Sequence, residues 1–170
     1  QPGVSFFERD PLTNEPLGTG REKAGGHIAA TFIPGDRSAY QERFVRWLPR
    51  AAAAGLTGVY DAWAAAPSEQ EAYEIWHSLS ESGDLSIRVF GSVRETDSAD
   101  LIANQFKSFE RNFTSEMVRP EAIKLAADGV PEGHTAFLLT PYVDSSNEDF
   151  GNPMIAKADM TANITTYFGA

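Results

Sequence analysis

Strand-like and helix-like patterns alternate through the middle of the chain, and this alternation limits the possible folds more than any other feature of the sequence. Three short apolar runs have the length and composition of strands, at Leu56–Trp63, Leu85–Phe90 and around Ile123–Leu125. Two segments between them carry apolar residues at helical spacing, from Ser68 to about Gly83 and from Ser98 to Phe113. Because a helix that joins two strands of one sheet makes those strands parallel, the pattern predicts an α/β fold.

The segments on either side of this alternation are less regular. Residues 1–37 are rich in Gly and Pro and lack sustained periodicity, so they predict an irregular arm ahead of one α/β domain over residues 38–170. Further helices are predicted from Ser38 to about Ala54 and from Met154 to Phe168. Only three to four parallel strands emerge, and a closed eight-stranded barrel needs far more chain. The sequence therefore predicts a piece of a larger structure.

Charge and composition exclude several classes of function. The chain has 14 Lys+Arg against 24 Asp+Glu, a formal net charge of -10, so no basic surface is available for nucleic acid. The absence of cysteine excludes disulfides, thiolate zinc sites and cysteine nucleophiles. No apolar run approaches the length of a membrane span. These features predict a soluble protein without a membrane or nucleic-acid partner; they favour the cytoplasm slightly and leave the compartment open.

The most informative single residue is Lys124, which lies between Ile123 and Leu125 in the third apolar run. An unpaired ammonium is too costly to keep in a buried parallel strand, so Lys124 needs a partner or a changed chemical form. The ordinary interpretation is a lysine paired with a nearby carboxylate such as Asp61 or Asp128. The run is followed by a polar turn. In β/α barrels, the residues at and after the carboxyl ends of the strands carry the reactive groups.

Four further residues are candidates for a substrate-binding or supporting role. Asp61 is expected near the carboxyl end of its strand, and Asp128 shares strand parity with Lys124 beyond the strand end. For Asp128, a structural role in the Asp-Gly turn is an equal alternative. His134 could face the mouth of a site, although a loop histidine bonded to backbone is the commoner outcome. Period-two alternation points Arg88 away from the aliphatic face, where it must be paired if it faces a barrel interior.

Several of these residues belong to a pattern that resembles a known family. The matching residues are Ile123-Lys124-Leu125, Asp128-Gly129, Thr135-Ala136, the aliphatic run Phe137-Leu138-Leu139 and Pro141-Tyr142, with weaker agreement at Ala54–Asp61, Ile87–Val89, Asp10–Thr13 and Pro16–Gly18. They resemble the amidohydrolase superfamily, and within it the amidohydrolase family 3 branch that includes N-substituted formamide deformylase-like enzymes. The resemblance covers most of the chain.

The resemblance implies a metal-dependent hydrolase with a TIM-type barrel that cleaves a carbon–nitrogen bond other than a peptide bond in a small amide-type substrate. One or two divalent metal ions, with zinc expected, lower the pKa of a bound water and polarise the carbonyl under attack. By the same resemblance, Lys124 is the lysine whose amine becomes a carbamate that bridges two metals. Carboxylation would turn a costly buried cation into an anionic oxygen ligand.

The sequence also departs from the family pattern. The paired metal histidines spaced as His-x-His are absent, since the histidines are His27, His77 and His134. We therefore expect an internal segment of a longer barrel, which binds no metal and is inactive by itself. A partial barrel exposes its sheet edges, so a homodimer or higher oligomer is expected. The alternative is a non-catalytic acidic α/β domain used for binding or assembly.

Overall fold

The computed structural model describes residues 7–20, 23–32, 35–62, 68–143 and 149–169. The chain divides into two compact units, one formed by residues 1–34 and 126–160 and the other by residues 35–125 and 161–170. The second unit holds a parallel sheet, and the first holds a hairpin, a helix and a long hydrogen-bonded loop. Among the described residues, no helix combines the length and the apolar character needed to cross a membrane.

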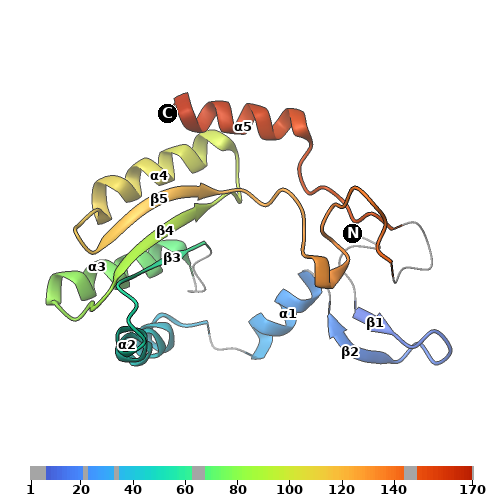
Figure 1. The fold of residues 1–170 in the computed structure, drawn as a ribbon, viewed down its shortest axis with the longest axis horizontal. Coiled ribbons are helices and arrows are strands. Elements are labelled where there is room, and N and C mark those ends of the chain that lie inside the picture. Colours follow the sequence, from blue (N-terminus) through green and yellow to red (C-terminus); the bar gives the residue numbers. More distant parts are fainter. Residues whose placement is uncertain (1–6, 21–22, 33–34, 63–67, 144–148, 170) are drawn as a thin grey trace. The chain divides into compact units, whose positions relative to one another are not determined.

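The parallel sheet has three strands in the order β3 (Gly58–Asp61), β4 (Arg88–Arg94) and β5 (Val118–Lys124). The connections between them are α3 (Glu69–Ser82) and α4 (Ala99–Phe113), as Figure 1 shows. Strand, helix and strand thus follow one another as the sequence predicted. The α/β class is confirmed, and the unit is consistent with part of a β/α barrel.

Helix α3 begins and ends at the residues that the sequence predicted. The Ser68 hydroxyl accepts a hydrogen bond from the backbone N–H of Glu71 at 3.2 Å, which is the N-cap bond of the predicted capping box, and donates one to the Glu71 carboxylate at 3.0 Å. Gly83 ends the helix with φ of 79°, a left-handed conformation that glycine adopts without strain. The capping interactions at its two ends therefore fix the length of α3.

Helix α2 (Arg37–Ala53) differs from its prediction at two points. Its N-cap is Asp36, whose carboxylate accepts from the backbone N–H of Ala39 at 2.8 Å, so the helix begins before the predicted Ser38. The sequence also allowed Pro49, which lacks a backbone N–H, to kink or divide this helix; α2 is not divided there. The apolar residues Leu48 and Ala51 on either side of Pro49 are both buried, and this packing holds the last turn in place.

Strand β4 was predicted over Leu85–Phe90 but runs from Arg88 to Arg94. Leu85 and Ile87 are buried, although they precede the strand. The predicted strand ended at Phe90, whereas β4 continues through Gly91. The structure gives the reason for glycine here, since a β-carbon at Gly91 would lie 2.3 Å from the Tyr73 hydroxyl oxygen.

The register between β4 and β5 shifts once. Gly91 pairs with Pro120 and Ser92 pairs with Ala122, so Glu121 is one extra residue on β5. Pro120 has no backbone N–H to donate, which makes this position a suitable one for the shift. Beyond it, Arg94 pairs with Lys124 at the carboxyl ends of the two strands.

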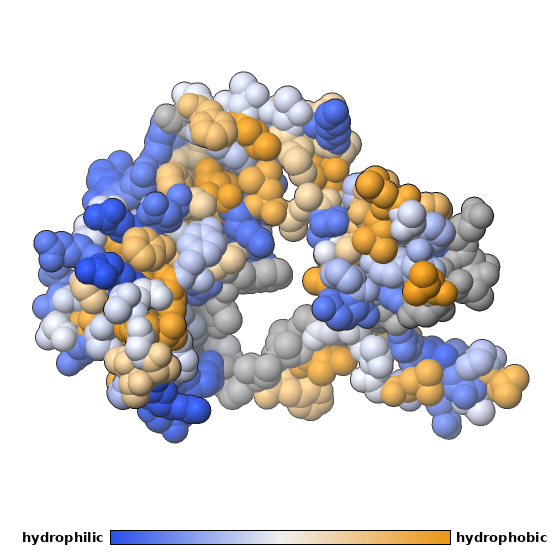
Figure 2. Space-filling view, in the orientation of Figure 1, coloured by the Kyte–Doolittle hydropathy of each residue, from blue (hydrophilic) through white to orange (hydrophobic). Residues whose placement is uncertain are grey.

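The core of this unit combines aliphatic side chains with an aromatic cluster and lies between the helices and one face of the sheet. Trp76 and Tyr73 of α3 are fully buried, and the Tyr73 ring packs edge-on to Phe109 of α4 with centroids 4.7 Å apart. Trp76 is therefore a core residue, as predicted. Hydrophilic side chains lie around the outer edge of the unit in Figure 2, in keeping with the charged outward face predicted for α4.

The predicted irregular arm contains regular structure. Strands β1 (Phe7–Arg9) and β2 (Pro16–Gly20) form an antiparallel pair, and α1 (Lys23–Phe32) follows. The Asp10 carboxylate accepts from the backbone N–H groups of Leu12 and Thr13, each at 2.8 Å, and so closes the turn of the hairpin. The Gly- and Pro-rich composition was thus correctly interpreted as turn chemistry, but the short strands it joins were missed.

The loop that follows β5 contains one short 3-10 helix, η1 (Pro131–Gly133), and leads to α5 (Lys157–Gly169). The carboxyl-terminal part of α5 is attached to the sheet unit through Glu95, which follows β4. The Glu95 carboxylate accepts hydrogen bonds from Asn163 at 2.5 Å and from the Tyr167 hydroxyl at 2.6 Å. Burial, together with the Glu95 charge, raises the pKa of Tyr167.

Candidate functional site

The carboxyl ends of β3, β4 and β5 bring three charged residues to one edge of the sheet. These residues are Asp61, Arg94 and Lys124, each the last residue of its strand. In barrels of parallel strands, the side chains at this edge are the ones that perform chemistry. Two of the five residues predicted for the site, Asp61 and Lys124, therefore share this edge.

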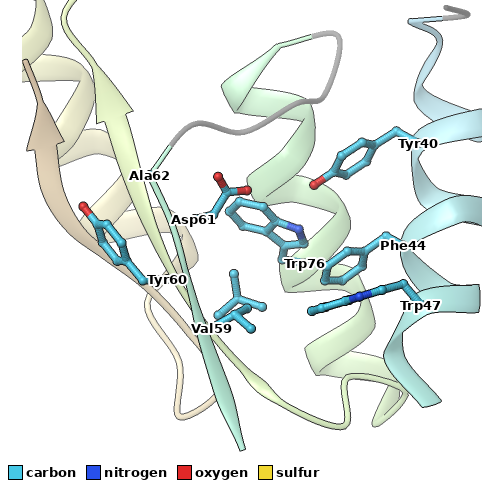
Figure 3. A pocket seen from close by; sticks show the side chains of 9 residues that line it. Tyr40, Phe44, Trp47, Val59, Tyr60, Asp61, Ala62 and Trp76 are labelled. Atoms are coloured by element: carbon cyan, nitrogen blue, oxygen red, sulfur yellow. The ribbon is translucent and has the colours of Figure 1, made fainter. Parts of the chain in front are cut away.

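The side chains of Asp61 and Lys124 lie on opposite faces of the sheet. Asp61 pairs with Gly91, which lies against Tyr73 and Trp76 of α3, and Figure 3 shows Asp61 on the same side of β3 as Trp76 and Tyr40. Lys124 pairs with Arg94, one residue beyond the fully buried Val93, and so projects from the other face.

The sequence left two interpretations of Lys124 open. The ordinary one paired its ammonium with Asp61 or Asp128. Within the part of the chain that the structure describes, however, no carboxylate lies within 4.0 Å of the Lys124 ammonium. Lys124 is half-buried. The predicted pairing with Asp61 or Asp128 is therefore not formed in the described part of the chain.

The edge also holds a carboxylate that the sequence analysis missed. Glu69, the first residue of α3, accepts a hydrogen bond from the backbone N–H of Arg94 at 2.9 Å. Strand β3 ends opposite Gly91, so the N–H of Arg94 has no strand partner on that side, and the Glu69 side chain takes its place. Burial raises the pKa of the Glu69 carboxyl, the hydrogen bond from Arg94 opposes this, and the charge of Asp61 adds to the increase.

The signal for Glu69 was present in the sequence but had another explanation. Ser68-Glu69-Gln70-Glu71 was interpreted as a capping box, and that role is filled by Ser68 and Glu71. Arg94 was missed because the predicted strand stopped at Phe90. A helix N-terminus that directly follows a strand end is where a carboxylate can reach the edge of the sheet.

Asp61 lies at a small cavity on the helix-covered face. The cavity has a volume of about 480 Å³ and is lined by Tyr40, Phe44, Trp47, Val59, Tyr60, Asp61, Ala62, Trp76 and Val89 (Figure 3). The backbone carbonyl of Asp61 accepts a hydrogen bond from the Ser92 hydroxyl at 3.1 Å, which fixes the end of β3. Burial raises the pKa of Tyr40 to about 12.

Arg88 lies at the opposite end of the sheet from Lys124. It is the first residue of β4, its side chain is exposed, and it pairs in register with Gly58. The predicted alternation is correct in that Arg88 points away from the buried Val89. Its position at the amino end of the strand separates it from the edge where chemistry is expected.

Asp128 and His134 lie in the other compact unit. The Asp128 carboxylate accepts a hydrogen bond from the backbone N–H of Phe137 at 2.9 Å. The His134 ring stacks on Tyr142 with centroids 4.2 Å apart, and its Nδ1 lies 3.9 Å from the Asp149 carboxylate. Both residues thus have contacts that stabilise the loop after β5.

The family-like motif residues of this loop are bonded to one another. The backbone N–H of Gly129 donates to the carbonyl of Thr135 at 3.1 Å, and the N–H of Val130 donates to the Thr135 hydroxyl at 2.9 Å. The Tyr142 hydroxyl donates to the carbonyl of Ala136 at 2.9 Å. Gly129 is required because a β-carbon there would lie 2.0 Å from the Thr135 hydroxyl oxygen. The Asp-Gly, Thr-Ala and Pro-Tyr motifs therefore build one compact loop.

The described residues do not make up a metal centre. They include no group of three or more histidines, aspartates or glutamates placed to share one ion. Lys124 would supply a single ligand after carboxylation, and stable zinc sites use three or four protein ligands. The donors among the described residues therefore do not fit a resident metal.

Comparison with known proteins places these features in context. The sequence profile described as "Amidohydrolase family", type 3, matches residues 7–167. Two solved structures share the fold, both titled as uncharacterized metal-dependent hydrolases. The one from Pyrococcus horikoshii OT3 has a TM-score of 0.63 and 18% identity over 96% of this chain and 32% of its own. The one from Pyrococcus furiosus has a TM-score of 0.62 and 18% identity over 95% of this chain and 33% of its own.

This chain thus spans about a third of the length of the solved structures it matches. At 18% identity, the likeness concerns the fold. No curated protein matches the sequence significantly. The profile match extends from β1 into α5 and includes Lys124 and the hydrogen-bonded loop after it. The chain belongs to the amidohydrolase family.

Proposed function

We propose that this chain is the part of a metal-dependent amidohydrolase that carries the lysine ligand, in a TIM-type barrel that hydrolyses a carbon–nitrogen bond of a small amide-type substrate. Lys124 is the residue on which the proposal depends. It ends β5, projects from the face opposite α3, and has no described carboxylate within 4.0 Å. N-substituted formamides are the substrate class to test first, given the family resemblance of the motifs.

In this proposal the Lys124 amine carries carbon dioxide as a carbamate. Carboxylation replaces an ammonium by an anionic oxygen ligand, which divalent metals such as zinc accept. The metal would supply Lewis-acid polarisation of the carbonyl and a water of lowered pKa. What this chain contributes is the position of Lys124, which the backbone pairing of β5 with Arg94 of β4 fixes.

Glu69 and the loop after β5 have supporting roles. Glu69 fills the hydrogen-bonding position left by the end of β3 and holds the backbone of Arg94, the register partner of Lys124. Asp128 ties the loop together through Phe137. Both carboxylates are positioning residues in this proposal.

The ligand count supports a further part of the proposal, that the 170-residue chain by itself neither retains a metal nor hydrolyses amides. The remaining ligands would come from the rest of the barrel, and the outer edges of β3 and β5 would associate with further strands or with another copy of the chain.

The test compares the 170-residue chain with the complete protein that its gene encodes. Elemental analysis and a formamide-hydrolysis assay should find zinc and activity in the complete protein and neither in the shorter chain. Stoichiometric zinc in the shorter chain would overturn the ligand assignment.

A matched pair of variants tests the lysine directly. In the complete protein, Lys124→Ala should abolish activity, and a small carboxylate such as propionate should restore part of it by supplying the lost oxygen ligand. Lys107→Ala, on the exposed face of α4, removes the same charge and should leave activity unchanged. A carbon-13 carbamate signal after growth with labelled bicarbonate should be present in the wild type and absent only in Lys124→Ala. Full activity of Lys124→Ala would refute the proposal.

A further inference from the structure

Glu95 connects the end of β5 to α5. It directly follows β4, and its backbone N–H donates a hydrogen bond to the carbonyl of Lys124 at 2.9 Å. Its carboxylate oxygen Oε1 accepts hydrogen bonds from the side chains of Asn163 and Tyr167 in α5, at 2.5 Å and 2.6 Å. All four residues belong to the same compact unit. One residue therefore bonds both to the backbone of the proposed lysine ligand and to a helix that is distant in the sequence.

The bonds to Glu95 are important for the attachment of α5. None of the described residues of α5 is buried, so apolar packing alone holds this helix weakly. The Tyr167 ring packs against the edge of the core, as does Ile123, the residue before Lys124. Hydrogen bonds to a carboxylate are stronger than bonds between neutral groups. The position of the carboxyl-terminal half of α5 is therefore coupled to that of Glu95.

The end of β5 is a point that needs such support. Lys124 is the last residue of β5, and in the described part of the chain β5 has a strand neighbour only on the side of β4. Hydrogen bonds at the end of a strand open more easily than those in its middle. A metal ligand, however, must be held within about 0.5 Å of its working position. The bond from the Glu95 N–H supplies part of this restraint.

The Glu95 carboxylate acts at a distance from the lysine amine. It is bonded to α5, whose Tyr167 packs on the core, whereas the Lys124 side chain projects from the opposite face. We propose that Glu95 is a positioning residue for Lys124, because its bonds to α5 hold the end of β5 in the place that the carbamate ligand requires. This inference rests on the proposed function.

The first experiment measures amide hydrogen exchange by NMR in the 170-residue chain. Tyr167→Phe keeps the ring and removes its bond to Glu95, so the Glu95 N–H should exchange about tenfold faster. The Val89 N–H, which bonds to the Met117 carbonyl at the other end of β4, should be unaffected. Tyr60→Phe, the same change at an exposed tyrosine of β3, should alter neither rate. An unchanged Glu95 rate in Tyr167→Phe, or an equal change at Val89, would overturn the coupling.

The second experiment uses the complete protein. Glu95→Ala should lower kcat about tenfold with little change in KM, since a displaced ligand weakens the transition state more than substrate binding. It should also reduce the carbon-13 carbamate signal of Lys124. Glu95→Gln keeps an acceptor for the Tyr167 hydroxyl and should recover most of both losses. Glu81→Ala, which removes an exposed carboxylate of α3, should behave as the wild type does.

The outcomes separate this inference from the proposed function. Thermal unfolding by circular dichroism identifies a misfolded variant, and Tyr167→Phe takes the place of Glu95→Ala in the same assays if the latter does not fold. A full carbamate signal and unchanged kcat in the folded variant would overturn the role of Glu95 and leave the proposed function intact. A wild type without the carbamate signal would refute the proposed function and, with it, the role of Glu95 in catalysis.

Discussion

Gly91 is the residue at which the packing of the sheet against α3 can be tested most sharply. A β-carbon built at Gly91 lies 2.3 Å from the Tyr73 hydroxyl oxygen, 2.7 Å from its Cζ and 3.0 Å from Cζ3 of Trp76. Tyr73 and Trp76 are 0% and 1% exposed, so neither ring has room to withdraw. Gly91→Ala should therefore destabilise the fold strongly.

The magnitude follows from the geometry. Overpacking a filled core costs typically about 1–3 kcal/mol. Because the closest approach here is far inside van der Waals contact, we expect a loss of about 3 kcal/mol or more in the free energy of unfolding. Urea unfolding, monitored by circular dichroism and tryptophan fluorescence, measures it.

A control and a rescue make this test specific. Gly58→Ala on the neighbouring strand places its β-carbon 3.4 Å from Phe90 and 3.5 Å from Arg88, which are ordinary contacts, and should change stability by about 0.5 kcal/mol or less. The Tyr73 hydroxyl is buried and has no hydrogen-bond partner among the described residues. Tyr73→Phe should thus be neutral or stabilising, and it should recover part of the loss in Gly91→Ala. Equal effects of Gly91→Ala and Gly58→Ala, or no recovery in the double variant, would refute this account of the packing.

Three further predictions concern other parts of the chain. Ser68→Ala removes the N-cap of α3 and should lower the free energy of unfolding by about 1 kcal/mol in urea titrations, whereas exposed Ser86→Ala should change it little. Burial raises the pKa of Glu69 in the folded state, so this carboxyl binds its proton more tightly in the folded protein than in the unfolded one. Its contribution to stability is therefore largest below the unfolded pKa and is lost as the pH rises through the folded pKa. Relative to Glu69→Gln, the wild type should therefore lose stability as the pH rises above the ordinary glutamate pKa of 4.5, and a pH-independent difference would contradict the raised pKa. Gly129→Ala should break the Thr135 contacts and speed proteolytic cleavage after β5, an effect that Gly35→Ala, whose β-carbon meets no atom within 4 Å, should not reproduce.

Local sequence signals predicted the α/β alternation, the limits of α3 and the core position of Trp76, because capping and apolar periodicity act within a few residues. The predicted end of β4 was wrong because the need for Gly91 comes from Tyr73, which is distant in sequence. For the same reason Arg94 and Glu69 were missed, since their contact depends on where β3 ends. Asp61 was correctly expected near a strand end, whereas Lys124 was expected inside its apolar run and is the last residue of β5; the face that each occupies follows from strand pairing.

The extra residue Glu121 decides which side chain of β5 enters the core. Upstream of it, Val118 and Pro120 are buried while Arg119 and Glu121 are exposed; continued alternation would carry Lys124 to the buried side. The insertion inverts this order, so Ile123 packs on the core and the lysine emerges on the other side. Without the shift, the same sequence would exchange the two and force an ammonium into the core, whereas deletion of Glu121 would remove the irregularity and leave both side chains on their present faces. The Lys124 side chain therefore lies on the face opposite the core because of the extra residue Glu121, three positions before it.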